Sequence, residues 1–170
     1  MKIKEFKKSW SFETQLLGKT EKWKKAYALR AINFLNEFKK GLTLNICCGL
    51  DKTGDILVDI DFKILKNNKN SILRTEIKDY ICADLFHLPF RNKEIFDTII
   101  CDPPYKYYNR FTWIQELAKR CKYRLILSSP AIDIKIGKQW NRDLYYITNP
   151  GIFLRLFWVF TKENSLIKHE

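Results

Sequence analysis

The chain alternates between short apolar segments and more polar stretches along most of its length. Seven segments are rich in Ile, Leu, Val or aromatic residues: Leu42–Cys47, Asp55–Ile60, Tyr80–Ala83, Phe96–Cys101, Tyr123–Ser128, Leu144–Thr148 and Phe153–Thr161. Short, nearly continuous apolar runs are typical of strands that are covered on both faces of a sheet. The pattern therefore predicts seven strands of a largely buried β-sheet.

Three other segments predict helices. From Thr20 to Lys40, apolar residues recur at three- and four-residue steps while lysines and arginines occupy other positions, which indicates an amphipathic helix. Thr20 can cap its start, and Gly41 follows a basic end, as at many helix termini. Phe62–Lys66 and Phe111–Cys121 predict two further helices, the first of them short.

Strands that alternate with helices predict an α/β fold with a doubly wound, mostly parallel sheet. The last two strands are joined by Asn149-Pro150-Gly151, which leaves no room for a helix and predicts a C-terminal antiparallel hairpin. Only nine residues separate Gly49 from Asp59, so the first crossover helix should be shortened or absent. We expect a single domain over residues 1–170, with a basic segment and helix at 1–40.

The charge of the chain favours a polyanionic partner. The net charge is +12, and the first forty residues carry eleven Lys and Arg against four Asp and Glu. Lys and Arg that neutralise phosphates release counterions, which favours nucleic acid, although a basic surface can also serve solubility alone. The longest apolar stretch, near Ile152 to Phe160, is interrupted by Arg155, so the sequence predicts a soluble, cytoplasmic protein without a membrane partner.

Metal, disulfide and serine-hydrolase chemistry find little support. Five cysteines, an odd number, fall mostly in apolar segments, where a free thiol behaves as a small hydrophobe. Cys47 and Cys48 lack the two-residue gap of a zinc knuckle, and the histidines His87 and His169 lie far from them in sequence. Ser128 lacks a Gly-x-Ser-x-Gly context.

Polar residues stand directly after four of the predicted strands, where open parallel sheets bind their ligands. The four segments are Asn45-Ile46-Cys47-Cys48-Gly49, Val58-Asp59-Ile60-Asp61, Ala83-Asp84-Leu85 with the following Phe86 to Phe90, and Cys101-Asp102-Pro103-Pro104-Tyr105. A glycine lets the backbone pass close to a ligand, or simply forms a turn. A strand-end carboxylate can accept hydrogen bonds from ribose hydroxyls, and both Asp59 and Asp61 are candidates, the second also as a helix cap.

This succession resembles the class I, Rossmann-like methyltransferases that depend on S-adenosylmethionine (SAM), over roughly Leu42 to Ser128. Asp102-Pro103-Pro104-Tyr105 is similar to the catalytic tetrapeptide of the branch that methylates amino groups of adenine, cytosine or guanine. The resemblance implies SAM as cofactor and methylation of a base amine, with DNA adenine-N6 favoured. Guanine-N2 or adenine-N6 in tRNA or rRNA fits about equally well. A nucleic-acid-binding module with a degenerate SAM site is the alternative from another class.

The resemblance also implies residue roles. The cofactor-binding positions are Asn45, Cys47, Cys48, Gly49, Asp59, Ile60, Asp84 and Leu85, with Asp84 accepting from the adenine amine. The catalytic positions are Asp102, Pro103, Pro104 and Tyr105. Asp102 and the Pro103 carbonyl would accept from the target amine, while Tyr105 stacks on the base. Two positions depart from the family, since Asp51 replaces a second glycine and Asn45 replaces a common acidic residue.

Basic and aromatic residues alternate next to the tetrapeptide. Lys106, Tyr107, Tyr108 and Arg110 can hold phosphates with their cations and bases with their rings, and Trp140 is a further candidate for stacking. For Phe111 and Trp113 we expect core packing instead, which is also the common role of a lone Trp such as Trp140. His87 is interpreted as a loop residue, because amine methylation does not require a general base.

Overall fold

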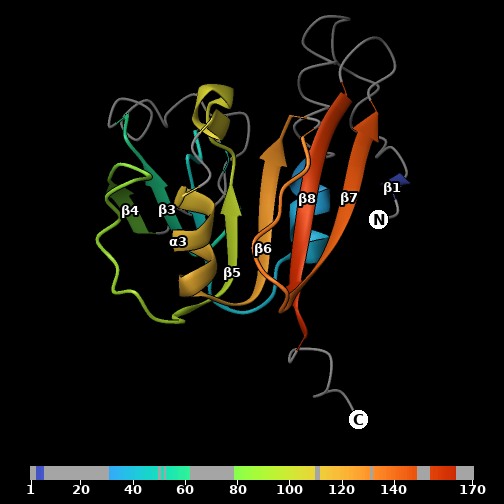
Figure 1. Ribbon diagram of the computed structural model, residues 1–170. Helices are drawn as coiled ribbons and strands as arrows, with labels where there is room; N and C mark the ends of the chain where they lie inside the picture. Colours follow the sequence, from blue (N-terminus) through green and yellow to red (C-terminus); the bar gives the residue numbers. More distant parts are fainter. Residues whose placement is uncertain are drawn as a thin grey trace, which may run out of the picture.

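The computed structural model describes residues 3–5, 31–49, 51, 53–61, 79–109, 112–130, 132–148 and 154–163. Within these ranges eight strands form one sheet in the order β1-β7-β8-β6-β5-β2-β3-β4 (Figure 1). The strands are β1 (Ile3–Glu5), β2 (Thr43–Ile46), β3 (Ile56–Asp59), β4 (Asp79–Cys82), β5 (Phe96–Cys101), β6 (Cys121–Ser129), β7 (Trp140–Thr148) and β8 (Leu154–Lys162). β2 to β6 are parallel, whereas β8 is antiparallel to β6 and β7. This confirms the α/β, mostly parallel sheet with an antiparallel C-terminal hairpin.

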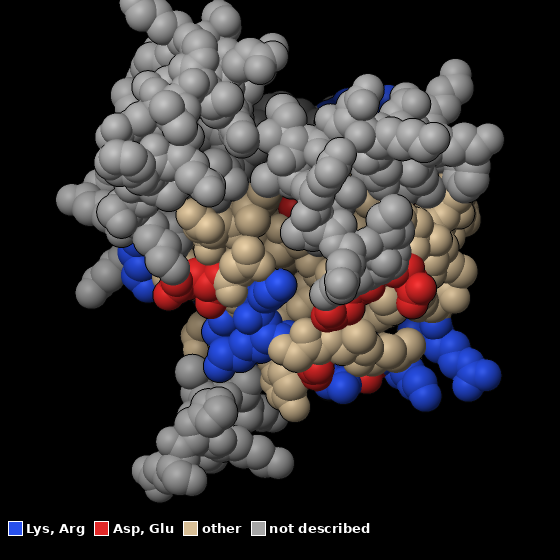
Figure 2. Space-filling view, turned by 180° about the vertical axis from the view of Figure 1, so that it is seen from behind, with Lys and Arg blue, Asp and Glu red and all other residues tan. Residues whose placement is uncertain are grey.

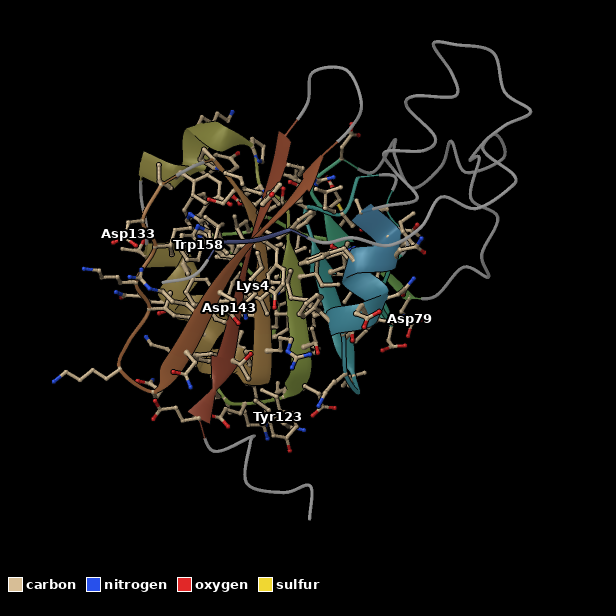
Figure 3. The ribbon with its side chains drawn as sticks, turned by 90° about the vertical axis from the view of Figure 1, so that its right-hand side faces the viewer. Lys4, Asp79, Tyr123, Asp133, Asp143 and Trp158 are labelled. Atoms are coloured by element: carbon tan, nitrogen blue, oxygen red, sulfur yellow. The ribbon has the colours of Figure 1, made fainter. Side chains whose placement is uncertain are left out.

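The first strand of the sheet was not predicted. β1 pairs in parallel with the edge of β7, with Ile3 opposite Leu144. Lys4 Nζ donates to Asp143 Oδ2 at 2.8 Å, and this hydrogen bond raises the pKa of Lys4 (Figure 3). Since three residues are too few to show a strand periodicity, β1 is recognisable only through its partner.

The two faces of the sheet are covered by different helices. Helix α3 (Thr112–Arg120) lies in front of the sheet in Figure 1 and buries Trp113, Ile114 and Leu117, in agreement with the predicted helix. The helix at residues 31–38 covers the opposite face, where Phe34 stacks on Phe157 with ring centroids 4.5 Å apart. The part of the predicted helix before residue 31 and the helix predicted at Phe62–Lys66 lie outside the described residues.

No helix occurs among the described residues between β2 and β3, as the short spacing predicted. The segment is hydrogen-bonded to β2 instead. Asn45 Nδ2 donates to the Thr53 carbonyl at 2.9 Å, and the Thr43 N–H donates to Asp55 Oδ2 at 2.9 Å. Asp51 Oδ1 accepts from the N–H and the hydroxyl of Thr53, and burial raises the pKa of this carboxyl group. Side-chain hydrogen bonds thus replace the packing of a crossover helix.

Gly41 is predicted to be essential for the link between the helix at 31–38 and β2. Its φ is +54°, and a Cβ built there would lie 2.2 Å from Asp97 Oδ2, which accepts the Leu42 N–H. Gly41→Ala should therefore lower the free energy of unfolding by roughly 2 to 4 kcal/mol in urea denaturation. Gly49→Ala is the matched control, because φ is +53° but a Cβ would meet nothing within 4 Å, so only about 1 to 2 kcal/mol should be lost. Equal losses in the two variants would rule out the steric explanation.

On the described part of the face opposite α3, basic and acidic side chains lie next to one another (Figure 2). This part of the surface is therefore not a uniform cationic patch, and many of the lysines of the first forty residues lie outside the described ranges. No helix in the described part of the chain is long and apolar enough to cross a membrane.

Candidate active site

A cavity of about 580 Å³ lies at the carboxyl ends of the parallel strands. One half is lined from β2, β3, β4 and the residues after them, by Cys47, Asp59, Ile60, Ala83, Asp84 and Leu85. The other half is lined from β5, β6, β8 and the segment after β5, by Asp102, Pro103, Pro104, Tyr107, Ser128 and Arg155. The strand order reverses between β2 and β5, and this switch point is where doubly wound sheets bind ligands.

Asp59 connects two loops beside the cavity. The side chain is nearly buried, its Oδ2 accepts the Gly49 N–H at 2.9 Å, and its Oδ1 accepts the Asp61 N–H at 3.0 Å. Each carboxylate oxygen retains acceptor capacity for a ligand. Asp59 lines the cavity and the exposed Asp61 does not, which separates the two carboxylates that the sequence left as alternatives.

The residues after β2 divide into those that face the cavity and those that do not. Cys47 lines it and has a φ of +53°, a left-handed conformation that normally favours glycine. Cys48 is buried, and burial raises the pKa of its thiol to about 12. Asn45 is buried within β2 beneath the following loop. The side chains of Asn45 and Cys48 are thus buried and do not line the cavity, and their contact with a cofactor stays a prediction.

The loop after β4 contributes Asp84 and Leu85 to the cavity lining. Both were predicted from the sequence as cofactor-binding residues. Asp84 Oδ1 also accepts the Phe86 N–H at 3.0 Å, and the Asp84 carbonyl accepts the His87 N–H at 2.9 Å. Asp84 therefore stabilises the turn that follows it and also lines the cavity. His87 is exposed and does not line the cavity.

The Asp102-Pro103-Pro104 segment is fixed at both ends. The Asp102 N–H donates to the Ile46 carbonyl at 3.2 Å, and the Pro104 carbonyl accepts the Tyr107 N–H at 2.9 Å in the 3-10 helix η3 (Tyr105–Asn109). No hydrogen bond from a described residue reaches the Pro103 carbonyl. The side chain of Tyr105, the fourth predicted catalytic residue, lies outside the described residues.

Two residues predicted to contact nucleic acid, Tyr108 and Trp140, have buried side chains. Tyr108 is buried and its hydroxyl donates to the Ser128 carbonyl, while Trp140 is buried in the core with Lys162 Nζ 5.4 Å from its ring centroid. A ring packed in this way offers no face to a base. Trp113 is in the core as expected, and Phe111 and the predicted contact Arg110 lie outside the described residues.

Two other predicted contacts remain candidates. Tyr107 lines the cavity and meets Phe86 edge-on, with ring centroids 5.4 Å apart. Lys106 is exposed, and its Nζ lies 5.2 Å from the Tyr107 ring centroid. The aromatic pair Phe86–Tyr107 and the Lys106 ammonium thus lie together beside the cavity.

Arg155 and Ser128 are site residues that the sequence did not predict. The Arg155 guanidinium forms an ion pair with Asp102 Oδ2, and its Nε donates to Ser128 Oγ at 3.0 Å. In the sequence, Arg155 is only the cation that interrupts an apolar strand. A charged residue within a strand that is otherwise covered on both faces was the available signal, since such a charge needs a partner.

The fold is that of the class I SAM-dependent methyltransferases. Magnesium protoporphyrin IX methyltransferase from Synechocystis PCC 6803, solved with bound SAM, superposes with a TM-score of 0.56 at 14% identity, over 92% of this chain and 86% of that one. An rRNA methylase from Streptococcus thermophilus superposes with a TM-score of 0.56 at 14% identity, over 78% and 93%. A putative methylase from Haemophilus influenzae gives 0.52 at 14%, over 80% and 88%. No protein-family model and no curated protein sequence matches this chain.

Proposed function

We propose that this chain transfers a methyl group from SAM to an exocyclic amino group of a nucleic-acid base. One observation carries the proposal. A single cavity joins the strand-end carboxylates Asp59 and Asp84, which suit a nucleoside cofactor, to the Asp102-Pro103-Pro104 segment, which suits an amine substrate. The methyltransferase fold agrees with this assignment.

The residues of the β2–β4 half fit SAM by their chemistry. Asp59 can accept from ribose hydroxyls while it keeps its two backbone N–H partners, and Asp84 can accept from the adenine amine. The space beside the Gly49 Cα is open to 4 Å, so a ligand can approach the backbone there. When bound, SAM supplies an electrophilic methyl group on a sulfonium.

The residues of the β5 side fit an aromatic amine. The lone pair of such an amine is delocalised into the ring, which makes it a poor nucleophile. Hydrogen bonds accepted by the Asp102 carboxylate and the Pro103 carbonyl would draw the nitrogen toward pyramidal geometry. The two prolines fix the backbone direction of that carbonyl, and the side chain of Asp102 is 43% exposed, so the proton released by the amine can pass to water.

The proposed partner is nucleic acid, with adenine-N6 of DNA as the first candidate. The net charge of +12 and the exposed Lys106 next to the cavity suit a phosphate backbone. Tyr107, which lines the cavity and is supported edge-on by Phe86, can contact a base that has been turned out of its helix. Guanine-N2 of RNA is the second candidate, favoured by the fold shared with the rRNA methylase.

Calorimetric titration with SAM and with S-adenosylhomocysteine (SAH) tests the cofactor first. Transfer from tritiated SAM to unmethylated DNA and to unmodified tRNA and rRNA transcripts tests the substrate, and mass spectrometry of the nucleosides identifies the methylated atom. We expect one saturable site and N6-methyladenine in DNA. A folded protein that binds neither SAM nor SAH would instead be a nucleic-acid-binding module with the methyltransferase fold.

SAH is predicted to protect Cys47 from maleimide labelling roughly fivefold or more, because most of a ligand's surface is enclosed by its cavity. Cys47 lines the cavity, whereas Cys48, Cys101 and Cys121 are buried and burial raises the pKa of each thiol, so these three should stay unlabelled near neutral pH. The exposed Cys82 is the internal control and should react equally with and without SAH. Peptide mass spectrometry measures each rate. Unchanged labelling of Cys47 would place the bound ligand elsewhere.

A further inference from the structure

The guanidinium of Arg155 is fixed from three sides. It pairs with Asp102 Oδ2, its Nε donates to Ser128 Oγ at 3.0 Å, and its central carbon lies 5.1 Å from the ring centroid of Phe157. Phe157 is itself buried against Phe34 of the helix at 31–38. The side chain of Arg155 is 22% exposed, so the cation is held in place largely by the protein.

The position of Arg155 follows from the topology of the sheet. β6 lies between β8 and β5, and Ser128 of β6 is opposite Phe157 of β8. Because side chains alternate along a strand, Arg155 is on the face of Phe157. It therefore reaches across β6 to Asp102 at the end of β5. An arginine suits this span, since its planar fork can donate to a hydroxyl and to a carboxylate at once.

The contact engages only one oxygen of Asp102. Arg155 binds Oδ2, and no hydrogen bond from the described part of the chain reaches Oδ1. A carboxylate that is 43% exposed would otherwise rotate freely about its terminal bond. The ion pair removes this freedom and leaves one acceptor available at the cavity.

We propose that Arg155 is a positioning residue for Asp102: it holds the carboxylate through Oδ2 so that Oδ1 faces the target amine. This inference rests on the proposed amine methylation. It adds an electrostatic consequence, because SAM carries a sulfonium cation and SAH a neutral thioether. Asp102 and Arg155 both line the cavity. While they form an ion pair, the attraction of Asp102 for the sulfonium and the repulsion by Arg155 largely cancel.

The ratio of SAM affinity to SAH affinity tests the ion pair without any methyl transfer. In calorimetry, Arg155→Met should raise this ratio about 3- to 10-fold, Asp102→Asn should lower it by a similar factor, and the double variant should return it to the wild-type value. A merely structural role of Arg155 would weaken both ligands in proportion. A ratio that does not move would thus overturn the inference, whereas a wild-type protein that binds neither ligand would overturn the proposed function as well.

Steady-state kinetics on the nucleic acid that the wild type methylates tests the positioning itself. Arg155→Met should reduce kcat about 10- to 100-fold while KM for the nucleic acid stays within about threefold. Arg155→Lys should restore the affinity ratio, which needs only the charge, but should restore kcat only in part, because an ammonium lacks the fork. A raised KM with unchanged kcat would instead identify Arg155 as a phosphate contact and contradict the proposal.

Arg142→Met is the matched control. Arg142 also pairs with a carboxylate, Asp133, and its guanidinium carbon lies 5.5 Å from the ring centroid of Trp158, but it does not line this cavity. Its replacement should leave both the affinity ratio and kcat unchanged. An equal effect from Arg142→Met would show that the readouts report general destabilisation, and it would overturn the assignment to Arg155.

Discussion

Replacement of Asp102 by alanine is expected to reduce methyl transfer by about a thousandfold while the affinity for SAH stays within about twofold. The carboxylate directly follows β5, on the β5–β6–β8 side of the cavity, whereas Asp59 and Asp84 line its β2–β4 half. Its loss removes the acceptor proposed for the target amine and leaves the proposed cofactor contacts of Asp59 and Asp84 in place. Tritium transfer from SAM and calorimetry with SAH measure the two quantities on the same sample.

Asp133→Ala provides the control for this prediction. Asp133 is an exposed carboxylate that also pairs with an arginine, Arg142, but lies outside the cavity. Transfer by this variant should match the wild type. A large loss of SAH affinity in Asp102→Ala would mean that Asp102 contacts the cofactor together with the residues of the β2–β4 half. That result would contradict the proposed division of the site.

The second large effect is expected at Asp59. Asp59→Ala should weaken SAM and SAH binding roughly 30- to 150-fold, equivalent to about 2 to 3 kcal/mol. The change removes the acceptor proposed for the ribose hydroxyls, and it also frees the N–H groups of Gly49 and Asp61 that the carboxylate holds. Calorimetry measures the affinity, and transfer at saturating SAM should recover most of the wild-type rate.

Asp61→Ala is the control for the Asp59 variant, because it removes a neighbouring carboxylate and keeps the backbone hydrogen bond to Asp59. Asp61 is exposed and does not line the cavity, and its N–H would still donate to Asp59 Oδ1. Cofactor affinity should fall less than about threefold. If Asp59→Ala and Asp61→Ala weaken SAM equally, the ribose contact has been assigned to the wrong carboxylate.

The sequence predicts strands β2 to β8 because each contains its own short apolar run, whereas the three-residue β1 does not. β5 is covered on both faces, and its apolar run Phe96–Cys101 matches the observed strand at both ends. β7 begins at Trp140, four residues before the predicted start at Leu144. The prediction missed these residues because Arg142 and Asp143 interrupt the apolar pattern. These polar residues have partners in Asp133 and Lys4, which lie elsewhere in the chain.

The candidate site likewise contains residues that the local sequence predicts and residues that only the tertiary structure reveals. Asp59 ends β3, Asp84 lies two residues after β4 and Asp102 directly follows β5, so the rule that ligands lie at strand carboxyl ends is sufficient to select them. Arg155 enters the site from a strand that runs in the opposite direction, and only the register of β8 against β6 reveals this. Tyr108 is likewise buried through tertiary contacts, among them its hydrogen bond to the Ser128 carbonyl, which local sequence does not encode.

The parallel pairing of β1 with β7 has a consequence for the order in which the chain can fold. Lys4 and Asp143 are 139 positions apart, so β1 cannot pair with β7 until that later strand has also been synthesised. The β2–β6 part of the sheet can assemble earlier, since its pairings involve residues closer in sequence. β1 precedes the other described strands in the sequence but is among the last of them to join the sheet, and until it does the edge of β7 remains open to other strands.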